Sequence, residues 1–171
     1  KFVAEPTEYH RVLNWLSQHN LCLKSEYPDR QVNNIYFDSF NHSSYCENIH
    51  GFSSKSKVRF RWYGCSKEPI NGSLEIKCKR NQLNWKIIYK VKGTLEENSN
   101  DWRTIRSNIR RQLPLEGRKW IEMNPLPVLI NRYKRKYFIS NDKKIRVTLD
   151  SDLQIYDQTR KLSPNYSLKA N

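Results

Sequence analysis

The chain has 171 residues, and its 31 Lys and Arg against 17 Asp and Glu give it a formal net charge of +14. This excess predicts a polyanionic partner, whether nucleic acid, a nucleotide or polyphosphate, or an acidic membrane surface. The length suits one domain, which we place at residues 1–171. Because no apolar run approaches the ~18 residues of a membrane-spanning helix, no transmembrane segment is expected.

The cysteines and glycines exclude two further classes. Four cysteines are widely spaced with no Cys-x-x-Cys pair, which argues against a zinc site. A disulfide-bonded secreted protein is the less favoured alternative to a reduced, cytoplasmic one. With five glycines the chain has no Gly-rich phosphate loop, so a Walker-type NTPase is excluded as far as motifs can exclude it.

The first third of the chain mixes short helices with strands. Its opening residues resemble the end of a strand, and the segment before residue 32 resembles a turn because it contains Pro and Asp. In chain order we expect a strand end at 1–3, a helix at 7–19, a turn at 27–30, a strand at 32–37 and a helix at 41–49.

The central third holds the clearest pattern. Two strands are predicted at 57–64 and 74–79, joined by a hairpin connection at 64–72. Strand side chains alternate between the two faces of a sheet. One face therefore carries Lys57, Arg59 and Arg61 on the first strand and Glu75, Lys77 and Lys79 on the second.

The last part alternates less regularly. We expect a strand at 85–91, helices at 101–113 and up to residue 123, and strands at 128–140, 144–150 and 153–156. About seven strands, mostly antiparallel, with inserted helices indicate an α+β fold with a dominant sheet.

The alternating charges allow two interpretations. Each strand could simply expose its charged face to water. However, a dense row of like charges repels itself unless an anion lies against it. The opposite faces carry Phe60, Trp62, Trp85 and Tyr137, which amphipathic helices could cover. A sheet closed around the charged face would form a channel, and a barrel of about eight strands can hold one ligand.

Five separated segments form a recognisable set of motifs. They are Arg30-Gln31-Val32-Asn33-Asn34-Ile35-Tyr36-Phe37-Asp38, residues 57–64 and 74–80, Arg132-Tyr133-Lys134-Arg135-Lys136-Tyr137-Phe138 and Ile145-Arg146-Val147-Thr148-Leu149-Asp150. Together they resemble the VTC domain, the polyphosphate-polymerase domain of the triphosphate tunnel metalloenzyme (CYTH-like) superfamily, and the likeness runs from residue 1 to about 157 in the expected order. The resemblance implies an antiparallel β tunnel barrel of about eight strands with flanking helices.

The resemblance also implies roles for individual residues. ATP or another triphosphate would bind in the tunnel, and its terminal phosphate would pass to inorganic polyphosphate with help from a divalent metal, Mn²⁺ or Mg²⁺. Phosphate binding is expected from Lys1, Arg59, Arg61, Lys77, Lys86, Tyr133, Arg135 and Arg146. The catalytic residues among these would be Arg59, Arg61, Lys77, Arg135 and Arg146, and the candidate metal ligands are Glu75 and Asp150.

One family feature is missing, which leaves alternatives open. Family members carry a Glu-x-Lys strand near the C-terminus, whereas Tyr166-Ser167-Leu168-Lys169 has no glutamate. A triphosphate hydrolase of the same fold, or a non-catalytic polyphosphate or nucleotide sensor, therefore stands beside the polymerase. An open basic sheet that binds nucleic acid is a third class, which is not expected.

Overall fold

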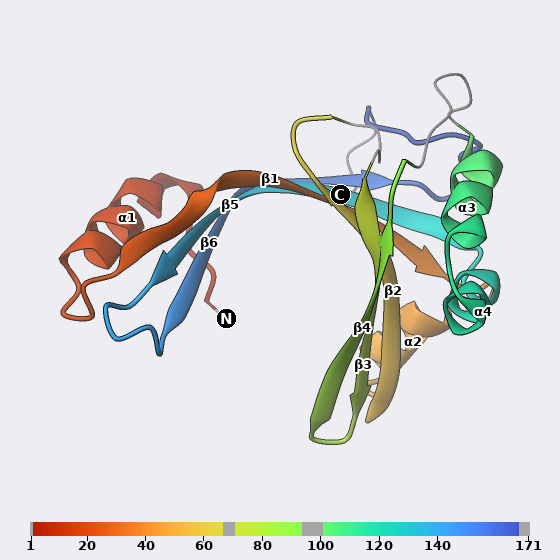
Figure 1. The fold of residues 1–171 in the computed structure, drawn as a ribbon, viewed down its shortest axis with the longest axis horizontal. Coiled ribbons are helices and arrows are strands. Elements are labelled where there is room, and N and C mark those ends of the chain that lie inside the picture. Colours follow the sequence, from red (N-terminus) through yellow and green to blue (C-terminus); the bar gives the residue numbers. More distant parts are fainter. Residues whose placement is uncertain (1, 67–70, 94–100, 168–171) are drawn as a thin grey trace.

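The computed structural model describes residues 2–66, 71–93 and 101–167. Figure 1 shows the elements in chain order. They are a 3-10 helix, η1 (Pro6–Glu8), then α1 (Tyr9–Gln18), β1 (Lys24–Asp38), α2 (Ser43–Ile49), β2 (Ser54–Tyr63), β3 (Gly72–Arg80), β4 (Leu83–Val91), α3 (Trp102–Arg111), α4 (Leu115–Met123), β5 (Leu126–Ile139) and β6 (Arg146–Asp157).

The strands form one antiparallel sheet in the order β4-β3-β2-β1-β5-β6. This confirms the α+β class and the pairing of the two central strands. In the described part of the chain the sheet has six strands, not about seven, and it is open, with β4 and β6 as its edges. The described residues therefore do not confirm a closed tunnel barrel of about eight strands.

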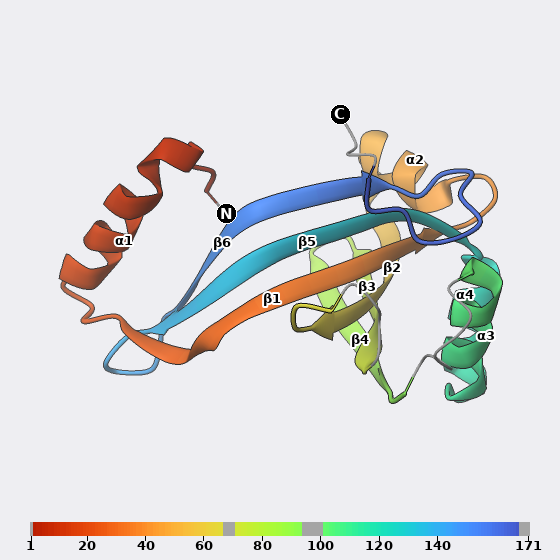
Figure 2. The same ribbon diagram turned by 90° about the horizontal axis from the view of Figure 1, so that it is seen from above.

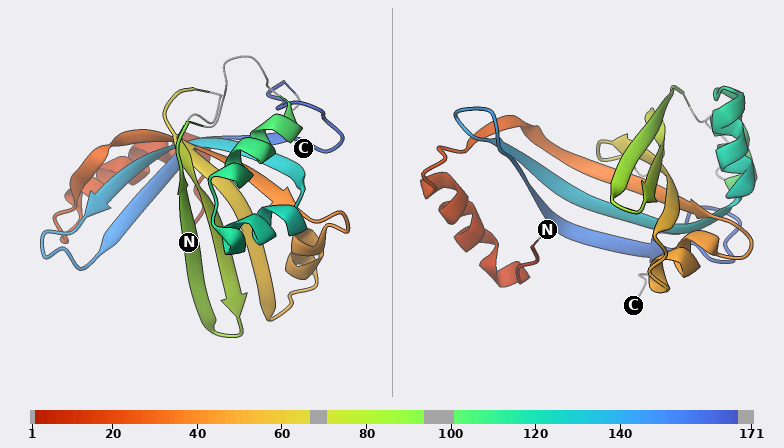
Figure 3. Two further views of the ribbon diagram at one scale, coloured as in Figure 1. Left: turned by 45° about the vertical axis from the view of Figure 1, so that its right-hand side comes forward. Right: turned by 90° about the horizontal axis from the view of Figure 1, so that it is seen from below.

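The sheet bends strongly, so that β2, β3 and β4 run at a large angle to the long strands β1, β5 and β6 (Figures 1 and 2). Helices α3 and α4 lie against one face of the bent part, while α1 stands at the far end of β1, β5 and β6 (Figure 3). The opposite face, which carries the alternating charges, is called the polar face below.

Alternation along β2 explains why the helices cover one face only. Val58, Phe60 and Trp62 are at most 1% exposed, and they form one core cluster with Ile105 and Ile109 of α3. Burying large apolar side chains contributes roughly 1.5–3 kcal/mol each, so this face is sealed by the helices. The residues between them, Arg59 and Arg61, must then point to the polar face.

The turn predicted at Tyr27–Arg30 is wrong, because β1 runs straight through it from Lys24. Pro28 cannot donate a backbone hydrogen bond, which favours the turn interpretation. Here β1 pairs only with β5, since its pairing with β2 covers residues 32–37, and the register shifts between Tyr27 and Arg30. The proline is accommodated because one edge of β1 is unpaired here and the strand contains a bulge.

Three other local predictions are corrected. The strands expected at 144–150 and 153–156 are one strand, β6, which contains a register shift near Asp152, a residue with φ of 53°. Phe2 and Val3 lie in no strand and are almost fully exposed. Tyr137 lies on the polar face, where its ring lies 5.9 Å from the guanidinium carbon of Arg30.

The cysteines and the helices can also be described. All four cysteines are free thiols, and only Cys78 is buried. In the described ranges, no helix combines the length and the apolar character that crossing a membrane requires.

Candidate functional site

The register of the central strands gathers the predicted cationic residues on the polar face. Arg59 of β2 pairs with Glu75 of β3 on one side and with Tyr36 of β1 on the other. Two residues further along β2, Arg61 pairs with Asn34 of β1. Because paired residues of neighbouring strands point to the same side of a sheet, these side chains form one continuous polar surface.

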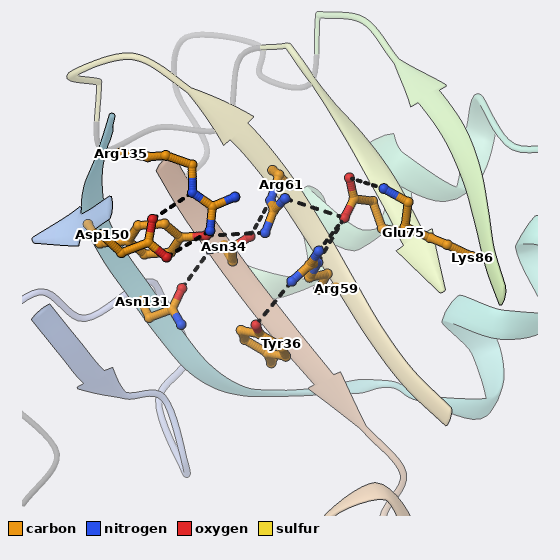
Figure 4. A network of polar contacts seen from close by, with 10 residues as sticks. Asn34, Tyr36, Arg59, Arg61, Glu75, Lys86, Asn131, Arg135 and Asp150 are labelled. Carbon is orange, nitrogen blue, oxygen red and sulfur yellow. Dashed lines mark hydrogen bonds and ion pairs between the residues drawn. The ribbon is translucent and has the colours of Figure 1, made fainter. Parts of the chain in front are cut away.

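Glu75 joins three cations of this surface (Figure 4). Its Oε2 accepts a hydrogen bond from Arg59 Nε at 2.8 Å, with Arg59 Nη2 at 2.7 Å and Arg61 Nη1 at 3.8 Å. Lys86 Nζ of β4 lies 3.8 Å from Oε1. Burial opposes ionisation of this carboxyl, which is 5% exposed, yet the charges of Arg59 and Arg61 prevail and hold the pKa of Glu75 below its ordinary value.

Arg61 is held by neutral residues as well as by charge. It is only 8% exposed, and its Nε donates to Asn34 Oδ1 at 2.7 Å. The amide of Asn34 in turn donates to Asn131 Oδ1 at 2.7 Å, and Arg61 Nη2 donates to the hydroxyl of Tyr133 at 3.3 Å. These contacts fix the guanidinium plane, so Arg61 presents its donors in one orientation.

Sequence reasoning missed Asn34, Asn131 and Tyr36 as site residues. Tyr36 accepts a hydrogen bond from Arg59 Nη1 at 3.4 Å. A usable signal existed in β1, where Asn33 and Asn34 interrupt an otherwise apolar, fully buried run. Buried amides require partners, so an Asn in such a run indicates a polar network.

Arg135 and Asp150 form a second pair on the same face. Arg135 Nε and Nη2 donate to the two carboxylate oxygens of Asp150 at 2.6 and 2.7 Å. The guanidinium carbon of Arg135 lies 5.2 Å from the ring centre of Tyr133, whose hydroxyl contacts Arg61. The two arginine groups are thus linked through Tyr133.

The two predicted metal ligands are far apart. Glu75 lies on β3 and Asp150 on β6, with β2, β1 and β5 between them, which is about 19 Å across the sheet at the ordinary strand spacing. Each carboxylate is already engaged by arginine. Across the described ranges, no group of three or more His, Cys, Asp or Glu could hold a metal ion. These residues do not fit one shared metal site, and divalent-metal binding remains a prediction.

Lysines continue the polar face beyond Glu75. Lys57 of β2 pairs with Lys77 of β3, and Lys77 pairs with Lys86 of β4, which forms a row across three strands. Lys57 and Lys77 pair with no carboxylate in the described part of the chain. Burial, together with the charges of Lys55 and Lys77, lowers the pKa of Lys57 despite an opposing effect of Tyr36. Such a row is strained by its own repulsion and favours an anion.

Two predicted residues are not brought to this site. Arg146 pairs with Ile139 at the far end of β5, about 13 Å along the strand from Arg135. Its side chain is 70% exposed and lies 3.6 Å from Glu26. Lys1 falls outside the described residues, as does Lys169.

A cavity among the described residues does not coincide with the polar face. It has a volume of about 340 Å³ and is lined by Gln31, Lys134, Asp152, Leu153 and Gln154. Gln31 and Lys134 are next to the polar-face residues Arg30 and Arg135 in sequence, so strand alternation places them on the other face of the sheet. We therefore take the polar face, not this cavity, as the candidate site.

Comparison with known families gives a match. A family model described as the VTC domain matches residues 1–170. The match includes every strand that contributes to the polar face, and it is consistent with a polyphosphate-related function. No curated protein matches the chain.

Proposed function

The chain belongs to the VTC domain family, and from this premise we propose that its polar face binds the triphosphate of ATP and extends a polyphosphate chain. In this reaction an oxygen of the chain's terminal phosphate attacks the γ-phosphorus. The bond between that phosphorus and the β–γ bridging oxygen breaks, and ADP leaves with the electron pair. The protein's contribution is to position the phosphates and to neutralise their charge.

The observation that carries this proposal is the sharing of Glu75 by three cations. Arg59, Arg61 and Lys86 contact one carboxylate, so the group keeps an excess of positive charge in a partly buried place. Arginine binds phosphate oxygens through two parallel hydrogen bonds, and charge is more effective where water is partly excluded. A triphosphate supplies the negative charge that Glu75 alone does not.

The lysine row supports a long phosphate chain as the second ligand. Lys57 and Lys77 continue the positive surface beyond Arg59 with no carboxylate partner in the described residues. Lysine is a flexible point charge, which suits a chain that must slide as it grows. Arg135 with Tyr133 extends the surface on the other side of Arg61.

Incubation with ATP and Mn²⁺ or Mg²⁺, followed by gel analysis of phosphate chains, tests the proposal. Long chains support polymerase activity, and their loss when the metal is omitted supports a metal requirement. Release of free phosphate without chains would make the protein a hydrolase. Binding of ATP without turnover would make it a sensor, a reading favoured by the engagement of both Glu75 and Asp150 with arginine.

Two double variants sharpen this assay. Arg59→Ala with Arg61→Ala removes the central arginines and should abolish chain synthesis. Arg103→Ala with Arg111→Ala removes the same charge from exposed positions of α3, on the helical side of the sheet, and should leave synthesis unchanged. Equal activity in both variants would refute the proposed site.

A further inference from the structure

The polar face holds a cluster of aromatic rings around one arginine at its end opposite the lysine row. The guanidinium carbon of Arg30 lies 5.4 Å from the ring centre of Tyr27, 5.7 Å from that of Tyr63 and 5.9 Å from that of Tyr137. Tyr27 and Tyr137 also meet edge to face, with ring centres 5.7 Å apart. The cluster joins three strands, β1, β2 and β5.

The cluster is open to solvent. Tyr63 is 49% exposed and Tyr27 is 44% exposed, and Arg30 is exposed as well. No carboxylate of the described residues pairs with Arg30. Half-exposed rings beside an uncompensated guanidinium form a flat surface with one positive charge, which is suited to stacking a planar, electron-rich ring.

Its position relates it to the phosphate-binding arginines. Tyr63 lies two residues from Arg61 on the same face of β2, about 7 Å away at the ordinary strand rise. Arg30 pairs with Arg135, which stacks on the ring of Tyr133. A ribose and its first phosphate can bridge the short span from Tyr63 to Arg61.

We propose that Arg30, Tyr27 and Tyr63 form a stacking platform for the nucleobase of the bound nucleotide. This inference rests on the proposed function and adds an orientation to it. The base lies at Tyr63, the triphosphate crosses Arg61 and Arg59, and the γ-phosphate points to Lys57. The growing chain is then held on the lysine row, away from the nucleoside.

The chemistry of the platform predicts its selectivity. Every base offers a face for stacking, so a stacking platform discriminates weakly between bases of similar size. ATP and GTP should bind within a few-fold of each other, and CTP, with a smaller ring, should bind more weakly. Inorganic tripolyphosphate has no base, so it cannot contact the platform.

Titration calorimetry with ATP and with tripolyphosphate tests the platform in three variants. Tyr63→Ala should weaken ATP binding by about five- to a hundredfold, the range that base–aromatic stacking contributes, and leave tripolyphosphate binding within about twofold. Arg30→Lys keeps the charge but loses the flat guanidinium, so it should also weaken ATP selectively. Tyr45→Ala removes a comparably exposed tyrosine from α2 and should change neither affinity.

The outcomes separate the platform from the proposed function. If the wild-type protein binds neither ligand, the proposed function fails. If tripolyphosphate binds but Tyr63→Ala and Arg30→Lys leave ATP affinity unchanged, the platform alone is overturned. An equal loss for ATP and tripolyphosphate would also overturn it, because the variants would then act through the phosphate contacts or the fold.

Discussion

Replacing Glu75 with Gln measures the contribution of the carboxylate that three cations of the polar face share. The amide has nearly the same shape but carries no charge, so Arg59 and Arg61 lose their shared counter-ion. We expect the free protein to become less stable and to bind tripolyphosphate more tightly, because the phosphates then replace the missing negative charge without competing for Arg59.

The magnitude follows from burial and distance. Removing one partner of a buried ion pair costs roughly 3–5 kcal/mol. The side chains of Arg59 and Lys86 are 19% and 44% exposed, so water compensates part of the loss. We therefore expect a decrease of about 2 kcal/mol in the free energy of unfolding, or about 4–8 °C in Tm for a chain of this size.

The gain in affinity can be bounded in the same way. One unit charge about 4 Å from another contributes about 1 kcal/mol even at the dielectric constant of water, so affinity for tripolyphosphate should rise by at least about fivefold. Chemical denaturation with and without tripolyphosphate, together with calorimetry, measures both effects. Weaker binding of tripolyphosphate to Glu75→Gln without metal would contradict the role of Glu75 as a competing counter-ion. A loss confined to metal-dependent ATP binding would make Glu75 a metal ligand.

Three other predictions follow from the same contacts. Lys57→Gln should raise the free energy of unfolding by a few tenths of a kcal/mol, because like charges side by side are removed, while weakening polyphosphate binding in calorimetry; a loss of stability would refute the repulsion. Because the pKa of Glu75 is lowered in the folded protein, the ionised carboxylate stabilises the fold. This stabilisation is fully present above the ordinary glutamate pKa of about 4.3 and is lost as pH falls through the lower folded value. In denaturant titrations the stability difference between wild type and Glu75→Gln should therefore be constant above about pH 5 and shrink below about pH 4. Ile109→Ala, in the contact between α3 and the sheet, should cost about 2–5 kcal/mol of unfolding free energy, whereas exposed Arg111→Ala should cost less than about 0.5 kcal/mol.

Alternation on β2 and β3 is the part of the site that sequence reasoning predicts best. Val58, Phe60 and Trp62 face the helices, so Arg59 and Arg61 must share the other face with Glu75. A strand whose one side is strongly apolar leaves no freedom of register, since a slip by one residue would bury both arginines.

The course of β1 and β6 could not be predicted in the same way. Both strands contain bulges, at Tyr27–Arg30 and near Asp152, where pairing with only one neighbour permits local irregularity. In sequence, a Pro or a break in the alternation of side chains predicts a turn. Only the partner strand β5 shows that each is one continuous strand.

The position of a residue along its strand was the second feature that the sequence could not predict. Arg146 and Asp150 share one face of β6, so they appear equivalent in the sequence pattern. The register places Asp150 beside Arg135 but Arg146 beside Glu26 at the far end of β5. Charge patterning alone does not indicate the neutral partners Asn34 and Asn131, although a buried Asn in a strand indicates a network.

Tripolyphosphate binding to the central arginine variant tests the central claim most directly. Arg59→Ala with Arg61→Ala should abolish measurable binding in calorimetry, whereas Arg103→Ala with Arg111→Ala should bind like wild type. Adding Glu75→Gln to the first variant removes the carboxylate that has lost both arginine partners. If this triple variant fails to bind but keeps a circular dichroism spectrum like that of wild type, binding was lost without unfolding. If the arginine variant binds within about threefold of wild type, a difference of roughly 0.7 kcal/mol, the polar face is not the phosphate site.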